Sequence, residues 1–175
     1  MYRPNWLELL MIAHHEHPKS IIAHRPRVMK FGDDQKPTGY NSWPLYKNAN
    51  HTEGDILFPT SGAGVLFPPH SLHPEALNTA RFMALCPTGD DIFWFAMCVL
   101  QGTEIRAPSD AQTNIIDIND EEAKKVSLWD STNRLGTNDV MIKAVFTAYD
   151  IYSRLKAHLK PMARNSASAS ESNDH

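Results

Sequence analysis

The sequence has no hydrophobic run long enough to cross a membrane. Its longest apolar segment, residues 92–100 (IFWFAMCVL), is about half of the roughly 20 residues that a transmembrane helix needs. The first residues, MYRPNWLE, place a proline and a glutamate where a secretory signal has its apolar stretch. We therefore expect no transmembrane segment and no leader. We expect a cytoplasmic protein, with attachment to the inner membrane surface as the alternative.

The sequence also has few cysteines and no excess of positive charge. The two cysteines, Cys86 and Cys98, are too few for a disulfide framework and lack zinc-finger spacing, which fits a reducing compartment. We expect both to be buried apolar side chains. The 17 lysines and arginines stand against 20 acidic residues, for a net charge of −3. No basic excess is present to neutralise phosphates, so no nucleic-acid partner is expected.

The length of 175 residues and a hydrophobic content of 42% indicate one domain with a sizeable core. Helical spacing predicts helices from Pro4 until Pro18 stops the pattern, over residues 92–101 before Gly102, and over residues 139–159. Short β-type runs occur at residues 20–24, 28–31, 105 and 114–118. This predicts an α/β domain over residues 1–160. Residues 161–175 have little apolar content, which predicts a disordered tail.

Two adjacent acidic residues, Asp90 and Asp91, precede the most apolar predicted helix. The segment from Thr88 to Asp91 has the form of a capping box, with Thr88 as N-cap and Asp91 at the third helical position. A helix start stabilises negative charge, so an ionised carboxylate here is a candidate general base. The alternative is that both acids serve helix stability alone.

Several other residues are candidates for binding a ligand. Arg25 and Arg27 follow a predicted strand, and paired arginines can hold a phosphate or carboxylate bidentately; solvated charges at a strand end are the alternative. The small residues from Ser61 to Gly64 would let backbone N–H groups approach a ligand closely, or simply form a tight turn. Trp43, in an irregular loop, either stacks on a ligand or covers the core.

Five ordered blocks of this sequence together resemble the C-terminal part of bacterial family 2-like glycosyltransferases of the GT-A fold. This group is found around surface-polysaccharide synthesis. The blocks are residues 2–7 (YRPNWL), 22–27 (IAHRPR), 40–43 (YNSW), 58–69 (FPTSGAGVLFPP) and 89–94 (GDDIFW). The resemblance runs from residue 2 to about residue 145 and implies a mixed sheet flanked by helices. In the family an Asp-x-Asp segment lies just before the part that corresponds to Tyr2, so the N-terminal nucleotide-binding half is expected to be missing here.

The resemblance implies an inverting transfer of a sugar from a nucleotide-sugar donor to a hydroxyl of a glycan acceptor. It implies Asp91 as the base with Asp90 as its orienting or acceptor-binding neighbour, and the reverse assignment stays open. The remaining substrate-binding residues expected by similarity are Trp43, Ser61, Gly62, Gly64, Trp94, Arg25 and Arg27. A divalent cation, Mn²⁺ or Mg²⁺, is expected in the intact enzyme, with no ligand to it in this chain.

Two other interpretations remain at this point. The first is a non-catalytic carbohydrate-binding or interaction module that keeps the acceptor groove. The second is a metal hydrolase that uses His70 and His73 with Asp55. If the nucleotide-binding half is missing, exposed apolar surface is expected, together with homo-oligomers or a separate chain that supplies that half.

Overall fold

The computed structural model describes residues 2–47, 54–111 and 136–157, which form a mixed α/β fold as predicted. The elements labelled η are 3-10 helices. In chain order the elements are α1 (Trp6–Glu16), β1 (Ile21–Ala23), β2 (Arg27–Val28), η1 (Tyr40–Ser42), β3 (Leu57–Phe58), η3 (Ser61–Ala63), β4 (Val65–Leu66), η4 (Pro74–Leu77), α2 (Thr79–Leu85), α3 (Asp90–Gln101), β5 (Ile105–Arg106) and α6 (Thr137–Ala148).

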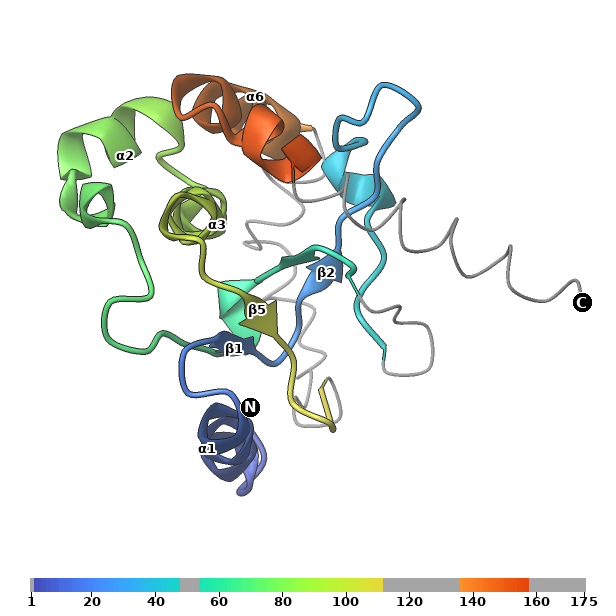
Figure 1. Cartoon of the computed structure of the whole chain (residues 1–175), viewed down its shortest axis with the longest axis vertical. Helices are drawn as coiled ribbons and strands as arrows, with labels where there is room; N and C mark the ends of the chain where they lie inside the picture. The colour runs from blue at the N-terminus through green and yellow to red at the C-terminus, as the bar shows by residue number, and fades with distance from the viewer. Residues whose placement is uncertain (1, 48–53, 112–135, 158–175) are drawn as a thin grey trace, which may run out of the picture.

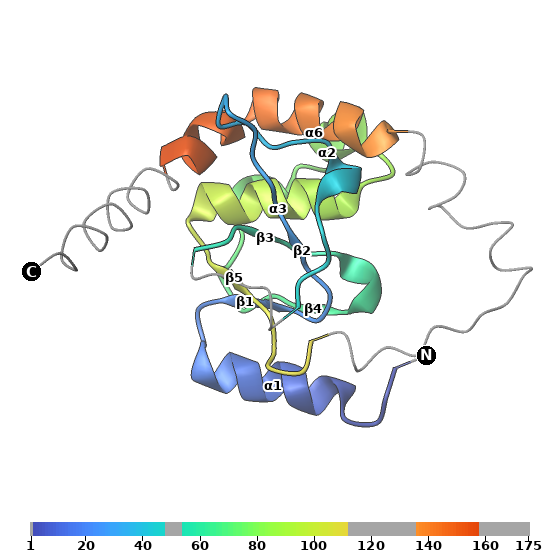
Figure 2. The ribbon, with the colours of Figure 1, turned by 90° about the vertical axis from the view of Figure 1, so that its right-hand side faces the viewer.

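Two small sheets lie at the centre of the fold. A three-stranded sheet has the order β4-β1-β5, with Ile22 antiparallel to Leu66 and Ile21 parallel to Ile105. A two-stranded antiparallel sheet joins β2 and β3. Helix α1 covers one side of the strands and α3 the other, while α2 and α6 lie beyond α3 (Figures 1 and 2). Because β1 is covered on both sides, all three of its residues are buried, which explains its unbroken apolar sequence.

Helix α3 is the centre of the main hydrophobic core. It is apolar almost all round because it lies between the sheets and α6, and Phe95 contacts both Phe58 and Phe146, with ring centroids 5.1 and 5.8 Å apart. Its buried residues are Ile92, Phe93, Phe95, Ala96, Met97 and Cys98. The prediction of buried cysteines is confirmed, and burial raises the pKa of Cys86 to about 11 and that of Cys98 to about 12.

The predicted capping box at the start of α3 is wrong. The helix begins at Asp90, and its N-cap is Gly89, which has no side chain to cap it. The Thr88 hydroxyl lies 3.6 Å from the Met141 sulfur of α6, while Asp91 bonds to a different loop. The other end of the helix follows the prediction, since Gly102 adopts the left-handed conformation (φ 75°) that ends helices.

The sequence pattern predicted the end of helix α1 correctly but placed the end of helix α6 too late. Helix α1 ends at Glu16, before Pro18, as predicted. Helix α6 ends at Ala148, well short of the predicted residue 159, because Asp150 has a φ of 51° and interrupts the helix before residues 151–157. The predicted strand at 114–118 and the predicted tail at 161–175 lie outside the described residues.

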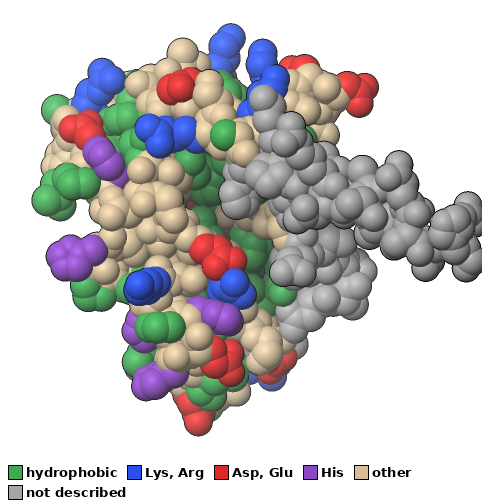
Figure 3. Space-filling view, in the orientation of Figure 1, with side chains coloured by type: hydrophobic (Ala, Val, Ile, Leu, Met, Phe, Trp, Pro, Cys, Tyr) green, Lys and Arg blue, Asp and Glu red, His purple; other side chains and the backbone are tan. Residues whose placement is uncertain are grey.

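The surface carries charges of both signs and some large apolar side chains. Acidic and basic side chains are interspersed on the face shown in Figure 3. The most exposed large hydrophobic residues are Leu77, Val140, Leu7 and Met83. Within the part of the chain that the structure describes, no helix has the length and apolar character needed to cross a membrane.

Candidate active site

The two acidic residues at the start of α3 have different environments. Asp90 is exposed, whereas Asp91 is half-buried and faces the turn η3. The backbone N–H of Ser61 donates a hydrogen bond of 2.8 Å to the Asp91 Oδ1 atom. The structure therefore singles out Asp91 as the acid whose carboxylate is fixed in position.

Burial raises the pKa of the Asp91 carboxyl above its ordinary value, and neighbouring Asp90 raises it further. Hydrogen bonds from Ser61 and the positive charge of Arg25 act in the opposite direction. The balance leaves Asp91 a stronger base than an ordinary aspartate. A raised pKa in a carboxylate at a helix start is a feature of proton-accepting sites.

The turn that holds Asp91 is itself locked by the start of α1. The Trp6 Nε1–H donates a hydrogen bond of 2.8 Å to the Ala63 carbonyl oxygen. Gly64 has a φ of 105°, and a Cβ atom there would lie 2.2 Å from the Trp6 ring. Gly64 therefore makes room for Trp6, and its predicted role in a sugar pocket remains a prediction. Ser61 and Gly62 are exposed at the turn.

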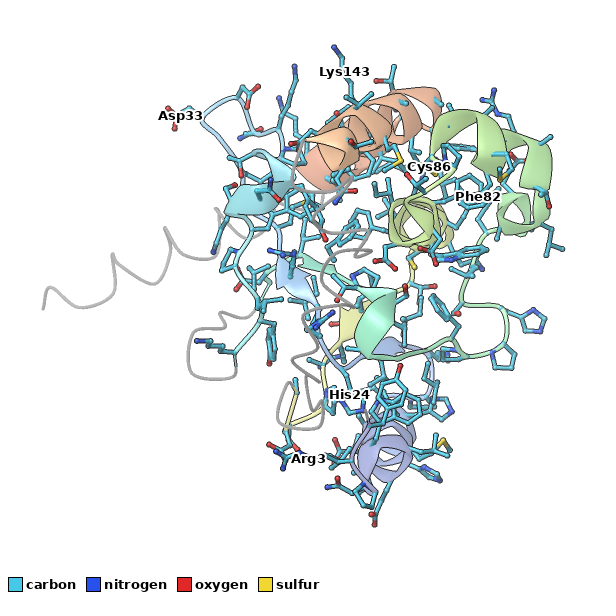
Figure 4. All side chains as sticks on the ribbon, turned by 180° about the vertical axis from the view of Figure 1, so that it is seen from behind. Arg3, His24, Asp33, Phe82, Cys86 and Lys143 are labelled. Atoms are coloured by element: carbon cyan, nitrogen blue, oxygen red, sulfur yellow. The ribbon has the colours of Figure 1, made fainter. Side chains whose placement is uncertain are left out.

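His24 contacts the backbone of Trp6. Its ring is fully buried, and its Nε2 atom lies 2.9 Å from the Trp6 carbonyl oxygen, an acceptor, so Nε2 carries the proton. Its Nδ1 atom has no hydrogen-bond partner among the described residues. In Figure 4 the labelled His24 lies where β1 meets α1. Burial lowers the pKa of His24, against smaller opposing effects of the Trp6 bond and Asp110.

The lowered pKa of His24 predicts a pH-dependent stability. The folded state holds the ring neutral, whereas the unfolded chain takes up a proton near its ordinary pKa of 6.5. The stabilisation is complete above this value and is lost as pH falls below it toward the folded pKa. We expect His24→Gln, whose amide can still donate to Trp6, to reduce the loss of unfolding free energy between pH 7 and 5, by at most about 1.4 kcal/mol per pH unit.

Urea unfolding across this pH range measures the effect. His15→Gln is the matched control, because His15 is exposed and its Nδ1 also lies near a helical carbonyl, that of Met11. Equal pH slopes for the wild type and His24→Gln would contradict the assignment.

The two candidate arginines have different roles. Arg27 is engaged: its Nη1 donates a 2.6 Å hydrogen bond to the Trp43 carbonyl oxygen, and its guanidinium lies 4.9 Å from the centre of the Tyr40 ring. The Arg25 guanidinium instead lies over the exposed turn, with Nη2 3.5 Å from the position of a Cβ atom on Gly62. The structure therefore brings Arg25 to Asp91 and assigns Arg27 to a packing role.

Tyr40 also belongs to this site, although no single motif of the sequence points to it. Its ring is buried, burial raises the pKa of its hydroxyl, and its surroundings include Arg25, Arg27 and Asp91. Its backbone N–H donates a 2.7 Å hydrogen bond to Asp139 of α6. The only signal in the sequence was its place in the YNSW block.

The two candidate tryptophans belong to packed clusters. Trp43 is 1% exposed and contacts Tyr40 and Phe58, so it covers the core and presents no face to a ligand. This corrects its predicted stacking role and confirms the alternative. Trp94 is partly buried and stacks on Phe82 of α2, with ring centroids 6.4 Å apart. Its predicted contact with a sugar remains a prediction.

Metal-ligating side chains do not gather at this site. Within residues 2–47, 54–111 and 136–157, no three His, Cys, Asp or Glu side chains are placed to hold a metal ion. The positive charge next to Asp91, that of Arg25, suits an anion and not a cation. The proposed set of His70, His73 and Asp55 is not formed, and the His73 Nδ1 accepts a hydrogen bond from the Glu75 N–H at the start of η4.

A separate pocket lies at the opposite end of α3, away from Asp91. It has a volume of about 510 Å³. Its apolar lining comes from Leu57, Phe95, Val99 and Leu155, and its charged lining includes the ion-paired Glu104 and Arg106. Asp91 and this pocket therefore lie at two different places in the fold.

Searches of protein-family models, of curated proteins and of solved structures found no match to this chain. The site comprises a half-buried aspartate of raised pKa, an exposed turn that fixes it, and an adjacent arginine.

Proposed function

We propose that this chain is a glycosyltransferase, or the acceptor-side part of one, that moves a sugar, with inversion, from a nucleotide-sugar donor to a hydroxyl of a glycan acceptor. The observation that carries this proposal is the Asp91 carboxylate, which burial makes more basic and which the Ser61 N–H holds at an exposed turn. The five blocks that resemble the GT-A family include Arg25, Ser61, Gly62 and Asp91, and these four residues lie together in space.

The proposed reaction needs one base at the acceptor. The Asp91 carboxylate removes the proton of the acceptor hydroxyl while the acceptor oxygen forms a bond to the anomeric carbon of the donor sugar. The bond from that carbon to the diphosphate breaks on the opposite face, so the configuration inverts and the diphosphate leaves with the electron pair. The Ser61 N–H fixes Oδ1 and thereby the direction of the carboxylate. Asp90, which is exposed beside it, is assigned to the acceptor.

The mixed sheet is in keeping with the C-terminal part of a GT-A domain. Strand β1 has an antiparallel neighbour on one side and a parallel neighbour on the other, with α1 and α3 on the two faces. The divalent cation expected from the family has no ligand set among the described residues, and Arg25 beside Asp91 does not suit one. The proposed proton transfer accordingly uses only residues of this chain.

A glycan-binding module without catalysis is the second candidate. It is favoured by the exposed backbone of Ser61 and Gly62 and by the arginine above it, which provide hydrogen bonds for binding without any proton transfer. This alternative requires binding of the acceptor alone, independent of any metal ion.

An NMR titration with acceptor oligosaccharides, with and without Mn²⁺ and a nucleotide-sugar donor, tests the proposal. We expect the amide signals of Ser61, Gly62 and Asp91 to shift with the acceptor, and a new glycosidic product to form when the donor is added. Binding at the turn without product, equal with and without Mn²⁺, would favour the module. Amide shifts confined to the pocket at the other end of α3 would contradict both.

A further inference from the structure

Arg25 is a half-buried cation that has no polar partner among the described residues. It follows β1, and its guanidinium lies against the turn at Gly62. The described residues provide the guanidinium with no hydrogen bond and no ion pair, although its charge lowers the pKa of both Asp91 and Tyr40. Arg25 is thus close enough to act on Asp91 and is not neutralised by it.

A guanidinium has five N–H donors arranged to match the two oxygens of a carboxylate or phosphate. Leaving such donors without hydrogen-bond partners in a partly buried position is unfavourable. The two neighbouring arginines differ in the partners that the structure gives them. Arg27 is engaged by the Trp43 carbonyl oxygen through its Nη1 and by the Tyr40 ring. The Arg25 guanidinium, which has no hydrogen bond to the described residues, presents its donors beside the exposed backbone of Gly62.

We propose that the acceptor is an acidic sugar, whose carboxylate or phosphate group binds Arg25 while a neighbouring hydroxyl of the same sugar meets Asp91. This inference rests on the proposed function. The turn η3 sets the geometry, since Ser61 contacts Asp91 and the next residue, Gly62, contacts Arg25. The anion and the hydroxyl are therefore recognised by adjacent residues of one turn, which suits substituents on neighbouring carbons of one sugar ring.

Binding of an anion to Arg25 also acts on the base. The Arg25 charge is one of the effects that hold the pKa of Asp91 down. An anion that neutralises this charge removes the effect, so the pKa of Asp91 rises further when an acidic acceptor binds. An acidic acceptor would thus strengthen the base that deprotonates it, which a neutral acceptor cannot do.

The test compares two disaccharides that differ only in their terminal sugar, which is glucuronic acid in one and glucose in the other. UDP is the third probe, because the anion that binds Arg25 could instead be the phosphate of the donor. Affinity is measured by calorimetry, and the Asp91 carboxyl is followed by ¹³C NMR across pH. We expect the wild type to bind the acidic disaccharide about tenfold or more tightly than the neutral one, in line with hydrogen bonds between charged groups. We also expect the Asp91 pKa to rise only with the acidic disaccharide.

Variants of Arg25 test whether this residue binds the anionic group of the acceptor. Arg25→Gln is expected to remove the tenfold preference for the acidic disaccharide, and Arg25→Lys to restore part of it. Arg106→Gln is the matched control, because Arg106 is also partly exposed but is paired with Glu104. The wild-type comparison of the two disaccharides needs no variant, so a variant that fails to fold leaves the test intact.

Two results would overturn the inference. Equal wild-type affinity for the two disaccharides would overturn the acidic acceptor, but the proposed glycosyltransferase would stand with a neutral acceptor. An Arg25 effect on UDP and not on the acidic disaccharide would assign Arg25 to the donor. The proposed function fails separately if the acidic disaccharide binds through Arg25 but Asp91→Asn leaves transfer unchanged.

Discussion

Asp91→Asn is expected to lower the rate of sugar transfer by about 10²- to 10⁴-fold, the contribution typical of a general base. The amide oxygen of asparagine can still accept the hydrogen bond that the Ser61 N–H donates to Asp91, so the turn should keep its place. What the amide cannot do is accept the proton of the acceptor hydroxyl. Acceptor binding is therefore expected to change little while the rate falls.

Folding should not suffer from this substitution. The pKa of Asp91 is raised in the folded state, so the ionised carboxylate is disfavoured by folding at pH values above that pKa. Replacing it with a neutral amide removes this cost, and we expect Asp91→Asn at pH 7 to unfold at the same or a slightly higher temperature than the wild type.

Asp90→Asn is the matched control, since Asp90 is the exposed neighbour on the same helix turn. Transfer rates at saturating donor and acceptor, together with thermal unfolding, distinguish the two residues. A large loss of rate in Asp90→Asn with little loss in Asp91→Asn would reverse the assignment of the base.

Gly64→Ala is expected to destabilise the fold by about 3 kcal/mol, from overpacking together with an unfavourable left-handed backbone. The added Cβ would lie 2.2 Å from the Trp6 ring, and the φ of 105° suits only glycine. Trp6 would have to move, and it holds the turn through the Ala63 carbonyl. The Ser61 contact to Asp91 should therefore weaken along with the stability.

Gly102→Ala is a close control for this prediction. Gly102 also has a positive φ, 75°, but no atom lies within 4 Å of its added Cβ. We expect it to cost only about 1 kcal/mol, from the backbone alone. Urea unfolding measures both variants, and Trp6→Leu should recover part of the loss in the Gly64→Ala background. Equal losses in the two glycine variants would show that the contact with Trp6 is unimportant.

The long-range contacts explain why the candidate site was only partly predictable. Arg25, Ser61, Gly62 and Asp91 were all selected from the sequence, and the structure places them together. The capping box was a reasonable expectation for Thr88 and Asp91, because local spacing is all that such a motif contains. The Ser61 N–H, 30 residues away in sequence, competes successfully for the Asp91 carboxylate, and nothing in the local sequence indicates this.

Local sequence also failed to predict where helix α6 ends. Ile151 and Leu155 are buried and keep a helical spacing with the residues of α6, so the predicted helix ran through the interruption at Asp150. Periodicity reports which side chains face the core and says little about a single backbone torsion between them.

The sequence by itself determined the α/β class, helix α1, the apolar helix α3 with its end at Gly102, and the burial of both cysteines. These follow from side-chain periodicity, glycine conformation and hydrophobicity, which act within a few residues. Only the tertiary structure decided that Asp91 and not Asp90 is held at the turn, that Gly64 accommodates Trp6, and that Trp43 is core. Each of these depends on which distant segments pack against each other, because a side chain's environment is set by neighbours that its own local sequence does not specify.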